Sequence, residues 1–168
     1  MIKIDETMCL FKADFIMAEN QKVVQGLQHI VTAVSQGADA HTIQSRIFAA
    51  KGLSKLAEKY AEHAAEERGY AEKCIDRLLD LGCAVKVEAK EEMPIYTDAL
   101  EYLKYDYQVS KDGLAWLAEL VEAARQDVTT YDLLKEYYQD EEGDMYWAEQ
   151  QIELAELIGK QNWYAKQV

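Results

Sequence analysis

Apolar residues recur along this chain every three to four positions, which is the spacing of one buried face on an α-helix. Four long stretches carry the pattern, at about residues 19–50, 53–81, 97–125 and 129–158. The 8 glycines and the single proline of the 168-residue chain leave these stretches almost free of helix breakers. The pattern therefore predicts an all-α protein in which four long helices pack around one core.

The residues between the stretches predict how the helices are joined. Gly52 and Gly82 are typical C-terminal stops, and Asp98 offers an N-cap for the third helix. A polar segment, 84–93, and Pro94 separate the second helix from the third. A connection of this length can cross from one end of an antiparallel four-helix bundle to the other. We therefore expect a long crossover between the second and third helices.

The length of the chain fits one domain with a substantial core. We expect the bundle domain to span residues 20–168 and to end, after Gly159, in a short C-terminal tail. Residues 1–19 are moderately apolar and form an N-terminal extension, which we expect to add a turn or strand packed on the bundle. Gly37 interrupts the first stretch and predicts a kink or local irregularity there.

Charge and cysteine content indicate which partners and which cellular compartment to expect. A net charge of −13 argues against direct contact with nucleic acid, because no basic stripe exists to meet phosphates. Cys9, Cys74 and Cys83 lack metal-ligand spacing and leave an odd count, which favours a reduced compartment. The N-terminus lacks a basic segment followed by a long apolar run, and no transmembrane stretch occurs. We expect a cytoplasmic protein without nucleic-acid or membrane partners.

Two glutamates stand on otherwise apolar faces of the second and fourth helices, and we identify no other acid on the four faces. Glu67 is followed three residues on by Tyr70, and Glu141 is followed in the same way by Asp144. Burying an ionised carboxylate without a partner costs roughly several kcal/mol, so cores avoid it unless a cation or hydrogen bond compensates. A cation shared by both glutamates would relieve their repulsion, with Asp144 and Tyr70 as further oxygen ligands. The pattern predicts a metal site at these four residues.

A second interpretation needs no metal. Acidic runs such as 140–144 are usually solvated, and a seam assigned by periodicity drifts over thirty residues, so either glutamate can fall at the bundle edge. Periodicity alone leaves both interpretations open. His41 lies on the apolar face of the first helix, where a lone histidine is more often hydrogen-bonded than a ligand. We expect His29 and His63 to face solvent.

The residues around both glutamates are similar to those of a known family. Segment 67–82 resembles the second helix of bacterioferritins, and segment 140–147 resembles their fourth helix. The ending 158–163, Ile-Gly-Lys-Gln-Asn-Trp, is similar to the Met-Gly-x-Gln-Asn-Tyr that closes many of them. The resemblance, from about residue 21 to the C-terminus, implies a ferritin-like antiparallel four-helix bundle. It also implies a homo-oligomeric shell, a dodecamer or a 24-mer, that stores iron oxidised at a dinuclear ferroxidase site.

The same resemblance carries only part of that dinuclear site onto this chain. The two glutamates that bridge the iron ions map to Glu67 and Glu141, which are both kept. The two histidines of the family map to Tyr70 and Asp144. Asp144 is an ordinary oxygen ligand for iron, whereas a tyrosine is a less common one.

The other expected ligands are replaced. The glutamate of the first helix maps to Val34, and that of the third maps to Ser110 or Gln108, depending on the helix from which residues are counted. The methionine that binds haem in bacterioferritins falls at Arg68, so no haem is expected. The resemblance thus implies a degenerate ferroxidase centre that retains two of six ligands, with Asp144 as a reasonable third.

Three hypotheses follow. The first, which we favour, is a bacterioferritin-like or Dps-like protein that binds and stores iron in a shell, with weakened or remodelled ferroxidase activity. The second is a ferritin-like oligomer that has lost the di-iron site and oxidase activity, with Glu67 and Glu141 hydrogen-bonded to each other and to Tyr70. The third is a mononuclear site with ferric iron on Tyr70 and three carboxylates. The negative charge disfavours direct DNA protection, as some mini-ferritins provide.

Overall fold

The structure is a computed structural model that describes the backbone of residues 6–168 and the side chains of residues 20–168. This part of the chain forms five helices and no strand, so the prediction of an all-α protein with four long helices is confirmed. The helices are α1 (Glu6–Ala50), α2 (Ser54–Asp80), α3 (Ala99–Ala123), α4 (Val128–Ile158) and α5 (Lys160–Lys166). The short helix α5 occupies most of the expected C-terminal tail.

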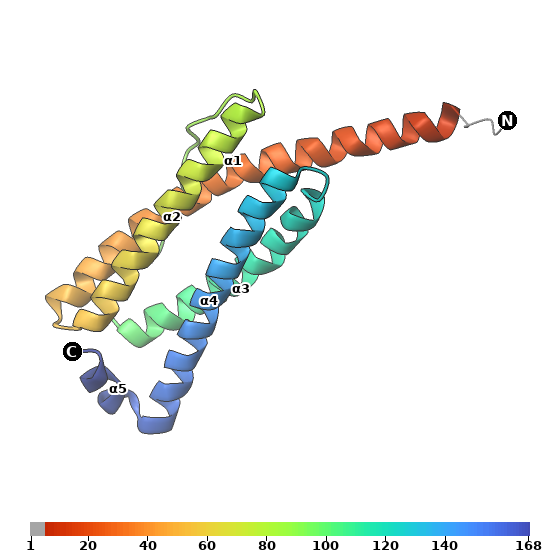
Figure 1. Ribbon diagram of the computed structural model, residues 1–168. Coiled ribbons are helices and arrows are strands. Elements are labelled where there is room, and N and C mark those ends of the chain that lie inside the picture. Colours follow the sequence, from red (N-terminus) through yellow and green to blue (C-terminus); the bar gives the residue numbers. More distant parts are fainter. Residues whose placement is uncertain (1–5) are drawn as a thin grey trace.

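The long helices form two hairpins, α1 with α2 and α3 with α4 (Figure 1). The segment between the hairpins follows α1 lengthwise: Gln28 Nε2 donates to the carbonyl of Lys86 at 3.0 Å, and Gln44 Nε2 donates to that of Tyr96 at 2.8 Å. It therefore delivers α3 to the end of the bundle where α1 stops. The predicted crossover between the second and third helices is confirmed.

Local signals at the helix ends act largely as expected. The carboxylate of Asp98 accepts hydrogen bonds from the backbone N–H groups of Leu100 and Glu101, so the predicted N-cap of α3 is confirmed. The cap of α4 is Asp127, whose side chain accepts from the N–H of Thr130. Gly52 follows α1 with a φ of 75°, a left-handed conformation that glycine adopts without strain.

The N-terminal part of the chain differs from the expectation. The helix α1 begins at Glu6 and continues without a break to Ala50, so residues 6–19 extend the first helix instead of adding a separate turn or strand. Residues 1–5 and the side chain of Cys9 lie outside the described part. The helix also passes through Gly37 without interruption. The division at residue 19 stays a prediction.

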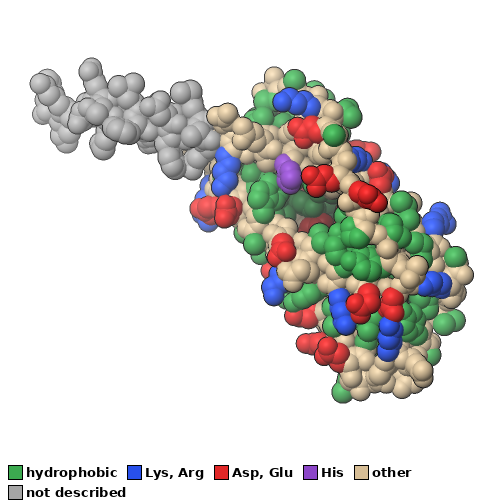
Figure 2. All heavy atoms as spheres, turned by 180° about the vertical axis from the view of Figure 1, so that it is seen from behind, with side chains coloured by type: hydrophobic (Ala, Val, Ile, Leu, Met, Phe, Trp, Pro, Cys, Tyr) green, Lys and Arg blue, Asp and Glu red, His purple; other side chains and the backbone are tan. Residues whose placement is uncertain are grey.

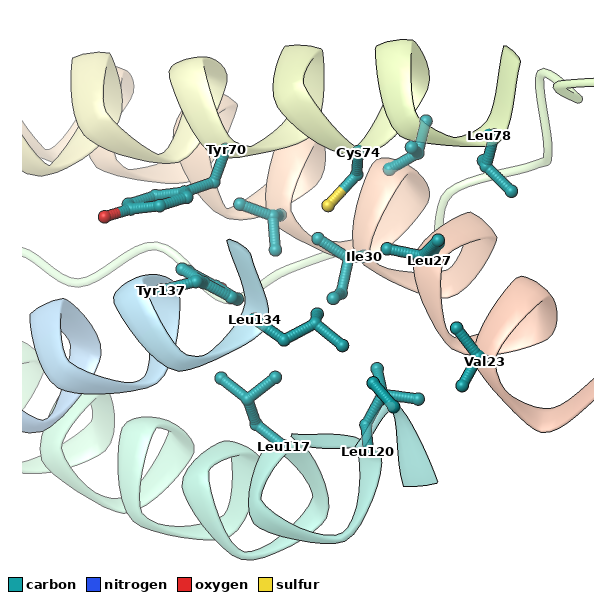
Figure 3. Packing of buried hydrophobic residues seen from close by; sticks show 13 residues of the cluster. Val23, Leu27, Ile30, Tyr70, Cys74, Leu78, Leu117, Leu120, Leu134 and Tyr137 are labelled. Carbon is teal, nitrogen blue, oxygen red and sulfur yellow. The ribbon is translucent and has the colours of Figure 1, made fainter. Parts of the chain in front are cut away.

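Buried apolar side chains of residues 20–168 form two hydrophobic clusters at different heights of the bundle. The first, part of which Figure 3 shows, is built around residues such as Leu27, Leu117 and Leu134. The second surrounds Phe48 and Trp163. Between the buried members of the clusters, each long helix has an interval that belongs to neither: 35–47, 61–69, 104–116 and 138–147. These intervals lie at one level of the bundle and carry four of the six buried polar residues in this part of the chain, Gln44, Ser45, His63 and Asp106.

Candidate metal centre

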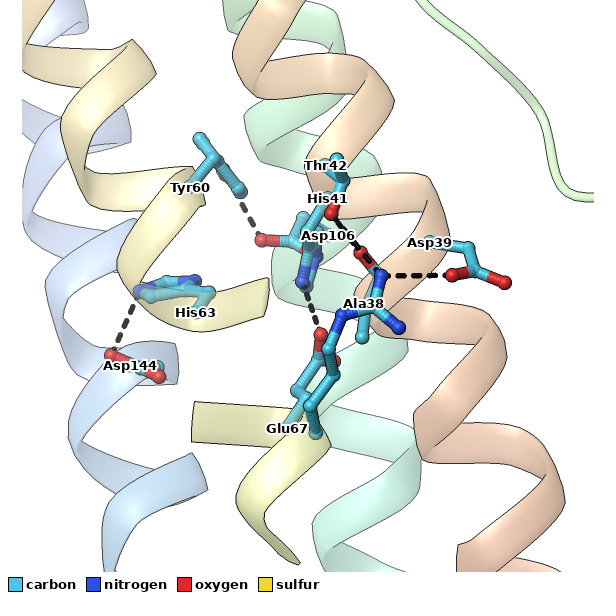
Figure 4. Close-up of polar contacts among 10 residues, drawn as sticks. Ala38, Asp39, His41, Thr42, Tyr60, His63, Glu67, Asp106 and Asp144 are labelled. Carbon is cyan, nitrogen blue, oxygen red and sulfur yellow. Dashed lines mark hydrogen bonds and ion pairs between the residues drawn. The ribbon is translucent and has the colours of Figure 1, made fainter. Parts of the chain in front are cut away.

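The polar layer between the hydrophobic clusters is organised around His41 of α1 (Figure 4). Its Nδ1 lies 2.8 Å from Oε2 of Glu67 on α2, and its Nε2 lies 3.0 Å from Oδ1 of Asp106 on α3. The hydroxyl of Tyr60 donates to the other oxygen of Asp106 at 3.0 Å. A continuous chain of polar contacts therefore joins three helices in the interior.

A second group of polar side chains joins α2 to α4. Oδ1 of Asp144 lies 3.0 Å from Nε2 of His63 and 3.0 Å from Nζ of Lys59. The His63 ring is nearly inaccessible, with 4% of its side-chain surface exposed. Its contact with Asp144 is an ion pair, which Figure 4 marks with a dashed line and which, against the effect of burial, lowers the pKa of Asp144, but among the described residues this buried nitrogen makes no regular hydrogen bond. Such unsatisfied groups are rare in folded proteins and call for an explanation.

The charges in the layer are only partly compensated. Burial alone would lower the pKa of His41, but hydrogen bonds to Asp106 and Glu67 hold it well above the usual value. The imidazole is therefore a cation at neutral pH, and both ring nitrogens donate. Burial raises the pKa of Glu141 to about 8, and the charges of Glu67 and Asp144 add to the rise. Glu141 thus keeps its proton at neutral pH unless another cation comes close.

Two hollows with shared lining residues reach this layer. A small cavity of about 10 Å³, roughly the space of one water molecule, lies among its ionisable side chains. Its lining consists of Ser110 and six ionisable side chains: His41, His63, Glu67, Asp106, Glu141 and Asp144. A cavity of about 400 Å³ opens between α1, α3 and the crossover, and extends inward to Glu67 and Glu141. The face drawn in Figure 2 is hollowed between hydrophobic and acidic side chains.

Gly37 provides the space that the carboxylate of Glu67 occupies. A Cβ atom at this position would lie 2.7 Å from Oε1 of Glu67, closer than carbon and oxygen atoms pack. The glycine in the middle of α1 therefore permits close approach of an acid from α2 and does not break the helix. Its function was not recognisable from the first helix alone.

Three of the four predicted site residues, Glu67, Glu141 and Asp144, meet in the layer. Tyr70 does not line its central cavity and belongs to the first hydrophobic cluster, where its ring stacks at 4.6 Å from that of Tyr137. Burial, with the charges of nearby acids, raises the pKa of Tyr70, which keeps it a neutral phenol. Metal binding by these four residues stays a prediction.

The positions that the resemblance assigned to the replaced ligands are now placed. Val34 is buried in the first hydrophobic cluster, and its side chain has no ligand atom. Ser110 lines both hollows, whereas Gln108 is exposed and donates to Asp112 at 2.8 Å. Counting through the third helix itself therefore selected the residue that faces the interior.

Part of this layer was not predicted from the sequence. The expectation that His63 faces solvent was wrong, and Asp106, 8% exposed, is an acid on an inner face that we had not identified. On α3 a step of four residues from Leu103 places Tyr107 on the apolar face, whereas a step of three residues is equally helical and places Asp106 there. Weighing both steps for every polar residue would have found both side chains. His29 is exposed, as expected.

No ready-made ligand shell is present within the described residues, because no three His, Cys, Asp or Glu side chains already stand around one point as metal ligands would. Their donor atoms are instead paired with one another or with Tyr60 and Lys59. The layer thus has suitable donors in a metal-free arrangement. Within residues 6–168, no helix is both long and apolar enough to span a membrane.

Comparisons with known proteins agree on one family. Residues 24–158 match the model of the ferritin-like domain. The bacterial ferritin of Neisseria meningitidis serogroup B is 36% identical over 156 residues, which cover 90% of this chain and all of the relative. That of Synechocystis is 30% identical over 133 residues, 77% of this chain and 85% of the relative. The bacterioferritin of Rhodobacter capsulatus is 28% identical over 151 residues, 86% and 91% of the two chains.

Proposed function

Because the chain belongs to the family of ferritin-like domains, we propose that it binds iron and stores it inside a shell of identical subunits. The relatives named above are bacterial ferritins and a bacterioferritin. The observation that carries the proposal is the buried layer of acids and histidines between two hydrophobic clusters. Interior carboxylates are costly to a fold and favour an ion that neutralises them.

We place this protein in the cytoplasm as a dodecamer or a 24-mer. Large apolar side chains exposed on the single chain support association: Leu157 is 83% exposed, Val128 69% and Leu79 59%. Such side chains gain free energy when a neighbouring subunit covers them. The negative surface also suits an interior that attracts cations, and iron can be deposited as a mineral against its acidic residues.

We expect this protein to oxidise iron more slowly than a ferritin with a complete dinuclear site, or to do so at a site with different ligands. Val34 offers no ligand atom, and Tyr70 packs as a neutral phenol in the first hydrophobic cluster. Two iron ions at the positions of the family would therefore share Glu67, Glu141 and Asp144. This set is small for two ions that must also leave a position open to oxygen. The same position of Tyr70 disfavours a mononuclear ferric site built on it.

The test combines assembly with iron uptake. The full-length protein is sized by light scattering, supplied with Fe²⁺ without oxygen, exposed to air, and passed through a desalting column. We expect a closed oligomer that carries ferric iron through the column, and a Glu67→Ala/Glu141→Ala variant that assembles but loads more slowly. A monomer or dimer that retains no more iron than an unrelated acidic protein would refute the storage function.

A second candidate function is a metal-independent ferritin-like scaffold without oxidase activity. It is favoured by His41, whose imidazolium supplies a positive charge between Glu67 and Asp106 without any metal. In that case the same experiment yields a complete shell that takes up iron no faster than buffer. The double variant would then behave like the unmodified protein.

A further inference from the structure

We infer that the polar layer is a metal centre displaced along the bundle from the positions that the family resemblance assigns. Its ligands would be two imidazoles and four carboxylates contributed by all four long helices. They are His41, His63, Glu67, Asp106, Glu141 and Asp144, the six ionisable side chains around the small cavity. The inference deepens the proposed function and rests on it only for the identity of the natural ion.

The displacement has the same direction on three helices. On α1, His41 lies seven residues after Val34; on α2, His63 lies seven residues before Tyr70. The two helices are antiparallel because a short turn joins them, so both steps lead toward that turn. The helix α3 starts beside the end of α1 and is also antiparallel to it, as the contact between Gln44 and the crossover shows.

On α3, Asp106 lies four residues before Ser110, which again leads toward the turn between α1 and α2. On α4, which ends at the second hydrophobic cluster, no displacement is needed, because Asp144 stands where the resemblance places the second histidine and lies three residues from Glu141 toward the same end of the bundle. Ligand atoms lost at one level of the bundle are thus matched by ligand atoms one to two helical turns away. Glu67, Glu141 and Asp144 are common to both levels.

His63 gives independent evidence for a missing partner at this level. Its Nε2 is buried and makes no regular hydrogen bond within the described residues; its one polar contact there is the ion pair at 3.0 Å with Oδ1 of Asp144. Two atoms that bind one ion at roughly 2.0–2.2 Å each lie about 3 Å apart when their bonds are near a right angle. The two side chains already have the spacing of neighbouring ligands, and an ion between them would satisfy both.

The other half of the layer has matching geometry. Nδ1 of His41 and Oε2 of Glu67 are 2.8 Å apart, close to the same ligand spacing. Gly37 leaves room for the carboxylate of Glu67, and the larger cavity brings solvent to Glu67 and Glu141. Tyr60 holds Asp106 from behind with a hydrogen bond at 3.0 Å, as residues behind metal ligands commonly do.

The donor set indicates the class of ion. Imidazole nitrogens mixed with carboxylate oxygens suit Fe²⁺, Co²⁺, Mn²⁺ and Zn²⁺, whereas Mg²⁺ and Ca²⁺ prefer oxygen ligands alone. A divalent ion neutralises two of the four carboxylates; Lys59, 3.0 Å from Asp144, supplies a further positive charge, and protonation of a carboxylate can supply the rest. The centre therefore fits a divalent first-row metal ion.

Co²⁺ is the probe, because it binds such ligands, absorbs visible light and needs no reaction with oxygen. The assembled protein, stripped of metal with a chelator, is titrated with Co²⁺ by calorimetry and by absorption. We expect saturable binding that weakens at least roughly tenfold in His63→Gln and in Asp106→Asn. Tyr70→Phe is the matched control at the family position and should bind like the unmodified protein.

The paramagnetic proton spectrum gives a readout that a purely structural role would not move. Ring N–H signals of imidazoles bound to Co²⁺ shift far outside the normal range, and one of them should vanish in His63→Gln. If His63→Gln fails to assemble, Gly37→Ala replaces it, because this change moves the carboxylate of Glu67 without removing any ligand and should weaken Co²⁺ binding. The inference would be overturned if the unmodified protein did not bind Co²⁺. It would also be overturned if Tyr70→Phe lost Co²⁺ binding while His63→Gln kept it. Storage can fail while Co²⁺ binds, so the two proposals fail separately.

Discussion

Gly37 offers the sharpest test of how the layer is built. In an ordinary helix interior, changing glycine to alanine stabilises a protein by about 1 kcal/mol. In this helix the added Cβ would lie 2.7 Å from Oε1 of Glu67, so the flexible carboxylate must move away from α1. That movement weakens the contact of 2.8 Å between Glu67 and His41. A hydrogen bond between charged partners contributes about 1.5–3 kcal/mol.

The two effects oppose each other, and the larger one decides the sign. Subtracting the helix gain from the lost contact predicts that Gly37→Ala destabilises the metal-free protein by about 0.5–2 kcal/mol. Gly143 is the matched control, because it lies in α4, is exposed and has no atom within 4 Å of a built Cβ. Gly143→Ala should therefore stabilise by about 1 kcal/mol.

Urea unfolding followed by far-ultraviolet circular dichroism measures both variants. Protein concentrations must be equal, because the stability of an oligomer depends on concentration. Titration with Co²⁺ then shows whether moving Glu67 also weakens metal binding, which we expect for Gly37→Ala and not for Gly143→Ala. If Gly37→Ala gains as much stability as Gly143→Ala, Glu67 does not lie against α1 and the arrangement around His41 is wrong.

Three further predictions concern the support of the layer and the fold. Tyr60→Phe leaves Asp106 short of one hydrogen bond and should destabilise the metal-free protein by about 1–2 kcal/mol in urea unfolding; an unchanged midpoint would contradict the contact. Leu134→Ala, at a fully buried core position, should cost about 2–5 kcal/mol, and a loss below 1 kcal/mol would speak against close packing there. Burial raises the pKa of Asp127, but hydrogen bonds from Thr130 and Arg77 outweigh it and lower the pKa. Because the folded pKa is the lower one, the stabilisation is complete above about pH 4 and disappears as the pH falls through the folded value. The stability difference between the unmodified protein and Asp127→Asn, measured by urea midpoints across this range, should therefore shrink on acidification, and a constant difference would contradict the linkage.

Helices and their ends were predictable because the signals are local. The N-cap at Asp98 and the stops at Gly52 and Gly82 depend on a few neighbouring residues, and the apolar repeat sums over a whole helix. The crossover followed from the length and polarity of segment 84–93. These features need no knowledge of what lies on the other side of the core.

The polar layer was only half predictable because its members are defined by partners on other helices. Glu67 and Glu141 stood out as acids among apolar residues, whereas His63 and Asp106 look like surface residues until α4 and α1 are placed beside them. Gly37 looked like a helix breaker because the sequence of α1 does not show that Glu67, on α2, needs the space that a glycine leaves. A single sequence predicts the apolar face of each helix to within one position. It does not predict how each helix is rotated about its axis, which decides the residues that meet across the core.

The cost of the layer is itself an argument about function. Burial that raises the pKa of Glu141 to about 8, together with an unsatisfied nitrogen on His63, makes the metal-free interior less stable than leucine and phenylalanine at the same level would. A scaffold whose only task is to assemble gains nothing from six ionisable side chains around a cavity of one water molecule. One imidazolium already compensates Glu67 and Asp106, and Lys59 pairs with Asp144. Among the described residues, however, buried Glu141 has no cation beside it, and His63 Nε2 has only the ion-pair contact with Asp144. An ion at this level accounts for these remaining groups together, and for that reason we favour metal binding over a scaffold that has lost it.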